Sequence, residues 1–313
     1  MKSNYKEKKG YLLIFIAGLL WGCIGLFIQA MENCGSTSPI TSFLRVSFSF
    51  VILAVVTSVK FGVSSFRVNK RTLFACALLG LVCHGIYNIF YSVAVLRAGV
   101  TISAVFLNTA PIFTAIFACF LFKETITTMK IIALVINIFG CVLATTGGSL
   151  NMNSFSIVGS LCGIGAGICY SLTAILGKFA GEKSNAFVIS TYSYMFATIF
   201  LAFFSRSFDV KILLSEEILI LGFLYALIPT AIAYLFYYQG VQLITESSKV
   251  PVIASVETII AAIIGTIVFR EPLDIVSMIG IIFVMISIAF NEFQITSGGR
   301  YVEEIKKRIK VVS

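Results

Sequence analysis

Apolar residues fill ten runs along this chain, and polar or charged residues separate each run from the next. About 20 consecutive apolar residues form a helix long enough to span the hydrocarbon core of a bilayer. Inside that core every backbone polar group must be bonded internally, which favours helices. The pattern predicts an all-α integral membrane protein with ten transmembrane helices, over residues 11–30, 38–59, 73–95, 101–122, 128–147, 156–177, 187–204, 218–240, 249–269 and 275–293.

The fourth and ninth runs carry an internal repeat. Residues 108–124, NTAPIFTAIFACFLFKE, align without a gap on residues 255–271, SVETIIAAIIGTIVFRE, at a constant offset of 147. Five of the seventeen positions are identical, and the same offset lays residues 90–95 on residues 237–242. A repeat in an apolar chain is typical of a transporter built from two related halves. Because each half would hold five helices, an odd number, the second half should be inverted in the membrane.

We therefore divide the chain into two repeats and two tails. An uncharged Gly/Ser/Asn stretch over residues 147–154 joins the halves. The expected segments are a basic N-terminal tail (1–10), a first five-helix repeat (11–147), a second, inverted five-helix repeat (155–294) and a basic amphipathic C-terminal tail (295–313).

Charge placement predicts the orientation of these segments. Lys and Arg are retained on the cytoplasmic side of short loops. With a cytoplasmic N-terminus, eighteen of the 23 Lys and Arg residues lie on the cytoplasmic side. We therefore expect both termini in the cytoplasm, with Lys123-Glu124 inside and its repeat partner Arg270-Glu271 outside.

The composition excludes several other classes of protein. Hydrophobic residues make up 58% of the chain and the mean hydropathy is +1.01, so a soluble globule could not keep this apolar surface from water. The net charge of +9 would suit a nucleic-acid surface, but the basic residues are scattered over short loops and tails, which is the pattern that sets topology. We expect no nucleic-acid partner. The C-terminal tail either lies on anionic lipid or is solvated.

Motifs for catalysis and for cofactor binding are missing from the sequence. It has no GxxxxGK[ST], no HExxH and no pair of membrane aspartates, and its eight cysteines form no CxxC or Cys/His spacing. We expect no enzyme activity, no cofactor and no metal site. An intramembrane enzyme or a helical scaffold without transport is the alternative of a different class, and the buried polar residues described next argue against the scaffold.

The chain resembles the EamA-type permeases of the drug/metabolite transporter superfamily over residues 11–294. Besides the ten spans, the resemblance rests on motifs in each half, namely Trp21-Gly22, Pro39 with Arg45, Asn108 with Pro111, and Glu124 and Glu271 after the fourth and ninth spans. One departure is Glu257-Thr258, where such proteins often have proline after the glutamate, so we expect the kink at Pro251 instead. The resemblance implies a secondary transporter that works by alternating access.

Glu257 is the strongest candidate for a substrate-contacting residue. It lies roughly 12 Å into the ninth span at 1.5 Å per residue, too deep for exposure to lipid. Ionisable groups at this depth normally face a cavity and mark a pathway. The carboxylate could bind an amine or exchange a proton, and a glutamate bonded to another helix is the alternative.

Polar and aromatic residues form a stripe on one face of the third span, and a matching stripe recurs in the eighth. Together with Trp21, such stripes would line a cavity for an organic solute, although aromatic rings at helix ends can also belong to an interfacial belt and His84 can be a packing residue. The candidate substrate-binding residues are Glu257, Trp21, His84, Tyr87, Asn88, Tyr91, Asn108, Tyr234, Tyr237 and Arg45.

Arg45 and three prolines complete the set of candidates. Arg45 could snorkel to the outer surface, hold a substrate carboxylate or pair with Glu257. Pro111, Pro229 and Pro251 fall inside predicted spans and should act as kinks or hinges.

The family resemblance implies export of an amino acid or a related small metabolite across the plasma membrane. Uptake of an organic cation such as a choline-like amine, through cation–π contacts with the tyrosines, is the alternative. We expect a small-molecule substrate and the lipid bilayer as partners, protons as a candidate coupling ion, and a monomer or homodimer.

Overall fold

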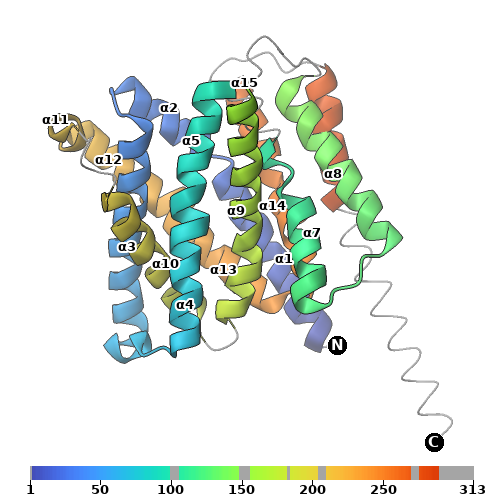
Figure 1. The fold of residues 1–313 in the computed structure, drawn as a ribbon, viewed down its shortest axis with the longest axis horizontal. Helices are drawn as coiled ribbons and strands as arrows, with labels where there is room; N and C mark the ends of the chain where they lie inside the picture. Colours follow the sequence, from blue (N-terminus) through green and yellow to red (C-terminus); the bar gives the residue numbers. More distant parts are fainter. Residues whose placement is uncertain are drawn as a thin grey trace, which may run out of the picture.

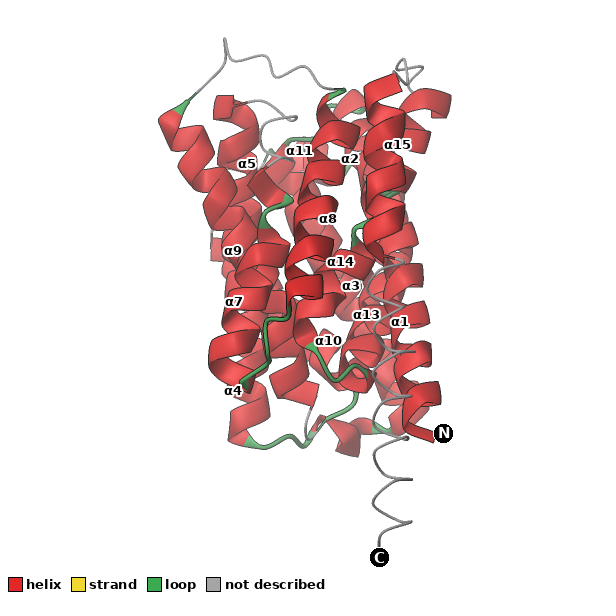
Figure 2. Cartoon of the chain, turned by 90° about the vertical axis from the view of Figure 1, so that its right-hand side faces the viewer, coloured by secondary structure: helices red, strands yellow, loops and turns green. Residues whose placement is uncertain are grey.

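The described part of the chain is a bundle of helices. A computed structural model describes residues 2–98, 106–147, 156–181, 184–203, 209–268 and 275–288. These residues contain helices, turns and short loops but no strand (Figure 2). The repeat partner Arg270-Glu271 and the C-terminal tail lie outside the described residues.

The helices of the first half, with their bounds, are α1 (Lys2–Trp21), α2 (Ile24–Asn33), α3 (Ser38–Phe61), the short η1 (Val63–Phe66), α4 (Lys70–Leu78), the π-helix η2 (Leu79–Ile86), α5 (Tyr87–Ala98), α7 (Ala110–Phe122) and α8 (Thr128–Thr146). Those of the second half are α9 (Ile157–Gly181), α10 (Ala186–Phe203), α11 (Val210–Leu213), α12 (Glu216–Ala226), the π-helix η5 (Leu227–Ile232), α13 (Ala233–Leu243), η6 (Ser247–Lys249), α14 (Val250–Ala254), α15 (Val256–Val268) and a last helix over 275–288.

These helices agree with the predicted membrane spans. In the described part, seven helices are long and apolar enough to cross a membrane. The three other predicted spans contain the shorter apolar helices Ala110–Phe122, Thr128–Ala144 and Ile275–Ile288. Large apolar side chains on the outside, such as Val59 and Phe120, are 83% and 80% exposed, as expected for a surface that faces lipid. The chain is an all-helical membrane protein, and the total of ten spans and the orientation of the termini stay predictions.

Several spans are interrupted rather than continuous. The first breaks at Gly22 and Cys23, between α1 and α2, and the ninth breaks at Ser255, between α14 and α15. Asn108 and Thr109 form a turn immediately before α7. At the repeat offset of 147, Asn108 corresponds to Ser255, so the fourth and ninth spans are interrupted at equivalent positions.

The π-helices follow the same symmetry. Residues of η2 shifted by 147 fall on 226–233, which contains η5. Proline explains part of η5, because Pro229 lacks the amide hydrogen that a regular helix would use. Single turns of π-helix occur frequently at functional sites.

The two aligned segments run in opposite directions. Glu124, just after the end of α7, bonds to Ser247 and Ser248, just before the start of α14. α7 therefore runs toward this end of the bundle, and α14 and α15 run away from it. This is the arrangement expected for an inverted repeat.

Glycines bring α8 and the last helix into close contact, and Figure 1 shows the two helices side by side. A Cβ atom on Gly280 would meet the backbone nitrogen of Ala144 and would lie 2.7 Å from the carbonyl oxygen of Gly140. Small residues allow this approach of helix backbones in membranes.

We expect Gly280→Ala to destabilise the protein, because the added methyl group meets backbone atoms that can yield only if the helices separate. Overpacking of this kind costs about 1–3 kcal/mol. A lower thermal midpoint of the purified variant in detergent would show the effect. The control is Gly25→Ala in α2, where an added Cβ meets nothing within 4 Å and the alanine favours the helix. An unchanged midpoint for Gly280→Ala would contradict the packing argument.

Candidate substrate-binding site

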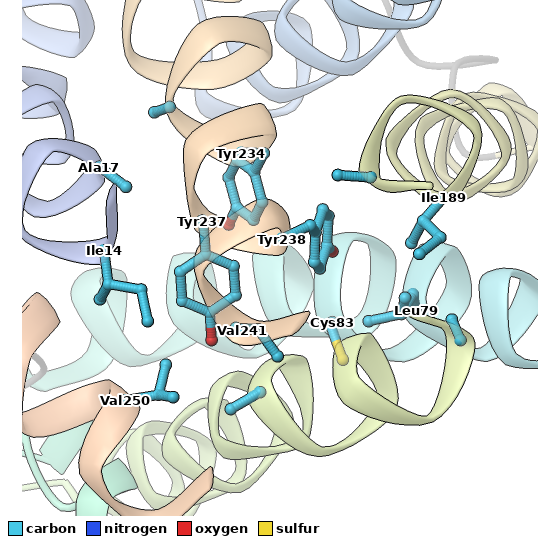
Figure 3. Packing of buried hydrophobic residues seen from close by; sticks show 14 of the residues in the cluster. Ile14, Ala17, Leu79, Cys83, Ile189, Tyr234, Tyr237, Tyr238, Val241 and Val250 are labelled. Carbon is cyan, nitrogen blue, oxygen red and sulfur yellow. The ribbon is translucent and has the colours of Figure 1, made fainter. Parts of the chain in front are cut away.

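The centre of the bundle holds a cluster of aromatic rings around Trp21. The Trp21 side chain is 4% exposed, and its ring centroid lies 4.9 Å from that of Tyr234, 5.0 Å from that of Tyr237 and 6.2 Å from that of Tyr170. Figure 3 shows Tyr234, Tyr237 and Tyr238 projecting from one helix, α13, beside α1. The rings are tilted or edge-on to one another, which are favourable arrangements for aromatic pairs.

The predicted stripe of the third span joins this cluster. Tyr87 stacks on Tyr91 at 5.8 Å between ring centroids and lies 6.1 Å from Tyr170 of α9. The repeat offset of 147 places Tyr87 on Tyr234 and Tyr91 on Tyr238. Tyrosines from equivalent helices of the two halves therefore belong to one cluster, which Tyr170 and Trp21 connect.

His84 and Asn88 are held by the protein itself. The His84 ring is stacked on Tyr194 at 4.6 Å, its Nε2 lies 3.3 Å from the Tyr238 hydroxyl, and its side chain is 4% exposed. The Asn88 amide donates to the carbonyl oxygen of His84 and accepts from the Ser42 hydroxyl at 3.4 Å. These contacts favour a packing role for His84, the alternative considered for it from the sequence.

Glu257 lies in the first turn of α15, immediately after the break at Ser255. Its side chain is half-buried, and within the described residues it has no hydrogen bond and no ion pair. Its carboxylate lies within electrostatic range of the tyrosines of the cluster, namely Tyr87, Tyr91, Tyr170, Tyr234 and Tyr237. An acidic group with no partner among the described residues thus lies near the aromatic cluster, on the ninth span.

Close packing of α1 holds this part of the ninth span in position. A Cβ atom on Gly18 would lie 2.7 Å from the carbonyl oxygen of Ala254, and one on Gly22 would lie 2.9 Å from that of Glu257. The Trp21-Gly22 pair therefore has two roles, because Trp21 supplies the central ring and Gly22 lets α1 approach the backbone beside Glu257.

The break at Ser255 is bonded from α8, and the same side chain of α8 also bonds to the last helix. The buried Asn137 of α8 donates to the hydroxyls of Ser255 at 2.6 Å and of Ser287 at 3.0 Å. Polar side chains of neighbouring helices can stabilise broken helices in membranes in this way. The break lies at Ser255 rather than at Pro251, since Pro251 is in the first turn of α14, where proline is tolerated.

Asn108 and Pro111 occupy the matching break in the fourth span. Asn108 is half-buried in the turn before α7, and Pro111 lies in the first turn of that helix. Both residues therefore lie at a helix interruption. Of the two, only Pro111 was predicted to interrupt the span, and it starts the following helix instead of kinking its interior.

Arg45 is held on the other side of the cluster. Its Nε donates to the Thr230 hydroxyl at 3.0 Å, its Nη1 donates to the Tyr225 hydroxyl at 3.2 Å, and its guanidinium carbon lies 5.0 Å from the centroid of the Tyr225 ring. Within the described residues Arg45 makes no ion pair with Glu257. A guanidinium has five N–H donors, and Arg45 uses two of them in bonds to the described residues. Arg45 lies within electrostatic range of Tyr87 and Tyr234, two tyrosines that are also within range of Glu257.

Three tyrosines of this region were not predicted as site residues from the sequence. Tyr170 contacts Trp21, Tyr194 stacks on His84, and Tyr225 holds Arg45. No periodic stripe marks them, because each is the only tyrosine of the region on its helix face. Among the described residues no group of His, Cys, Asp and Glu could hold a metal ion.

Comparisons with known proteins agree with this architecture. The sequence model of the EamA-like transporter family matches residues 8–146 and 157–292. An uncharacterized transporter of Clostridium kluyveri is 22% identical over 292 residues, which cover 91% of this chain and 93% of that protein. An uncharacterized transporter of Archaeoglobus fulgidus is 24% identical over 272 residues, covering 87% of this chain and 92% of that protein. A crystal structure with 14% sequence identity superposes with a TM-score of 0.78 over 93% of this chain and 98% of that one, which shows a shared fold.

Proposed function

Because this chain belongs to the EamA-like transporter family, we propose that it exports a zwitterionic amino acid or a closely related small metabolite across the plasma membrane. It is a multi-pass membrane transporter and not an enzyme. The observation that carries the choice of substrate is the pair of charged groups at the tyrosine cluster, namely the carboxylate of Glu257, which has no partner among the described residues, on one side and the guanidinium of Arg45 on the other. The direction of transport is taken from the family resemblance.

Glu257 supplies a negative charge that has no partner among the described residues. Burying a carboxylate is costly unless it is paired, so an unpaired one inside a membrane is normally functional. The ammonium group of an amino acid would complete the pair. A proton can take the same place when the site is empty, which makes Glu257 the candidate for coupling to protons.

Arg45 supplies the complementary charge. Its guanidinium is anchored by Thr230 and Tyr225 and is not neutralised by Glu257. An anchored, planar guanidinium is well suited to hold a carboxylate through two parallel hydrogen bonds. A ligand with both an ammonium and a carboxylate group would use both residues, whereas a simple amine would use only Glu257.

Movement of the substrate would follow from the interrupted helices. In transporters with inverted repeats the site lies near the middle of the membrane, and the two halves change their relative arrangement around it. Here the breaks at Asn108–Thr109 and at Ser255 occupy equivalent positions in the two halves. One chain contains both halves, so the pathway needs only a monomer, and a homodimer would hold two pathways.

Uptake of an organic cation is the second candidate, and the aromatic cluster favours it. Rings of Trp and Tyr around one acidic group are the usual means of binding a quaternary ammonium ion. Trp21, Tyr234 and Tyr237 lie within 6.0 Å of one another between ring centroids. In this case Arg45 would have a structural role.

A ligand screen by thermal unfolding tests both candidates. A ligand that binds only the folded state stabilises it by about 2.7 kcal/mol at a concentration of 100 Kd. We expect neutral amino acids to raise the unfolding temperature of the purified protein in detergent, and the corresponding amines without a carboxylate to raise it less. A rise with quaternary amines and none with amino acids would favour the organic cation. No rise with either class would contradict both.

A further inference from the structure

A network of five charged residues closes the end of the bundle at which α1 begins. We call Glu124, Lys130, Lys178, Glu246 and Lys249 the charged network. Three are basic and two are acidic, and they come from the ends of α7, α8 and α9 and from the loop between α13 and α14. The network joins the two halves, because Glu124 and Lys130 belong to the first half and the other members belong to the second.

Glu124 is the centre of the charged network. Its Oε1 accepts from the backbone nitrogen of Ser247 at 2.6 Å, and its Oε2 accepts from the backbone nitrogen and the hydroxyl of Ser248 at 3.3 and 2.7 Å. The same carboxylate lies 3.7 Å from the Lys178 ammonium and 4.0 Å from that of Lys130. Its side chain is only 8% exposed. One side chain of the first half thus holds the start of the ninth span.

Glu246 makes the second set of ion pairs. Its Oε2 lies 2.8 Å from the Lys130 ammonium and 3.1 Å from that of Lys249. Burial raises the pKa of Glu246, but the hydrogen bonds and positive charges of Lys130 and Lys249 outweigh burial and hold this pKa below its usual value. Glu246 is therefore ionised at neutral pH and continues the charged network from Lys130 to Lys249.

Lys178 attaches α9 to the same point. Its ammonium donates to the carbonyl oxygen of Thr245 and lies 4.6 Å from the centroid of the Phe122 ring at the end of α7. Glu7 of α1 accepts a hydrogen bond from the backbone nitrogen of Thr245 at 3.4 Å. Segments of the first, fourth, fifth, sixth and eighth spans, and the start of the ninth, are therefore held together at this end.

Buried side chains fill the space between the charged network and the aromatic cluster. Tyr11 of α1 is 4% exposed, Ala174 of α9 is 2% exposed and Ala118 of α7 is fully buried. Helices α1, α7 and α9 are thus packed together between the aromatic cluster and this end. A substrate could leave the site in this direction only if the charged network opened.

Ion pairs of this kind suit a contact that must open and close. The attraction between two buried charges is largely offset by the cost of removing them from water. Opening the end of the bundle would return both charges to water, so the closed and open arrangements would differ little in free energy. An apolar contact of equal area would lack this compensation, because its opening exposes apolar surface.

We propose that the charged network is the gate at this end of the transport pathway, and that Glu124 is the residue that locks it. The proposal rests on the aromatic cluster being the transport site. Opening requires Glu124 to release the backbone of Ser247 and Ser248, which frees the start of the ninth span to move away from α7 and α9.

Accessibility of an introduced cysteine tests the proposal without any substrate. Ala174→Cys, in a background with the eight native cysteines replaced, puts a thiol one helical turn from Lys178 on the same face of α9. A membrane-impermeant maleimide is added from either side of oriented vesicles. We expect Glu124→Gln to speed labelling from the side of the charged network by about tenfold, since bonds to a charged group are lost.

Two further variants separate gating from loss of structure. Glu246→Gln removes two ion pairs from a more exposed site, at 33% side-chain exposure, and should also speed labelling. Glu32→Gln is the matched control, because Glu32 is exposed at the end of α2, away from the charged network. If Glu124→Gln does not fold, the labelling rate of Glu246→Gln tests the proposal instead. Labelling as slow as in the parent, in folded protein, would overturn the proposal.

The result is independent of the substrate assignment. If neither amino acids nor amines stabilise the protein in the ligand screen, the proposed substrate is wrong, but the labelling rates still report whether the charged network gates this end. If labelling is unchanged while amino acids bind, the gate is wrong and the proposed function stands.

Discussion

Replacing Glu257 with glutamine should reduce substrate flux by about a hundredfold, because a charge pair with the substrate is lost. Glutamine has nearly the same shape and can still form hydrogen bonds, so the substitution removes mainly the negative charge. The measurement is flux of the stabilising ligand in proteoliposomes, compared at equal amounts of reconstituted protein.

Stability separates this functional role from a structural one. Because the Glu257 carboxylate has no hydrogen bond or ion pair within the described residues, its loss should leave the unfolding temperature unchanged or slightly raised. Glu216→Gln is the matched control, since Glu216 is exposed in the first turn of α12 and faces no part of the aromatic cluster. A Glu257→Gln protein that fails to fold, or one that transports normally, would show that the carboxylate does not bind substrate.

Replacing Arg45 with methionine should distinguish an amino acid substrate from an organic cation. Methionine keeps much of the apolar stem and removes the guanidinium, so a ligand carboxylate loses its partner. We expect binding of an amino acid to weaken by about a hundredfold and binding of the corresponding amine to change by less than about threefold. Ligand-induced shifts in unfolding temperature measured over a range of concentrations give both affinities.

The anchors of Arg45 supply a graded control. Tyr225→Phe removes one of the two hydrogen bonds and keeps the ring over which the guanidinium lies. It should weaken amino acid binding by about tenfold, through loss of one bond to a charged group, without affecting the amine. Equal losses for amino acid and amine in Arg45→Met would indicate that Arg45 supports the site instead of contacting the carboxylate.

Some residues of the site could be predicted from the sequence, and the roles of others could not. Tyr87 and Tyr91 were predicted with Tyr234 because each recurs at helical spacing and at the repeat offset, and the structure joins Tyr87 and Tyr234 to one cluster around Trp21 and Tyr170. Glu257 stood out because a lone acid within an apolar run has few structural explanations. The role of Arg45 was left among three options, since its contact with Thr230 spans 185 residues of sequence.

The contacts of the charged network could not be predicted from the sequence either. Glu124 was noted as a repeat motif, but its bonds to Ser247 and Ser248 and its proximity to Lys178 join parts of the chain that are far apart.

The break in the ninth span was expected at the only proline nearby, Pro251. It lies at Ser255, where Asn137 and a turn satisfy the backbone and side chain without proline.

The sequence by itself determined the class of the protein, its helical spans and its two-fold internal repeat. Apolar runs about as long as a bilayer is thick admit few other structures, and the repeat is visible as an offset of 147. Only the tertiary structure decided which faces of the helices meet. In a membrane chain both the lipid-facing and the inward-facing sides are apolar, so the contrast that marks the buried face of a helix in a soluble protein is weak. Contacts such as those of Trp21, Arg45 and Glu124 therefore depend on how the helices are rotated and packed.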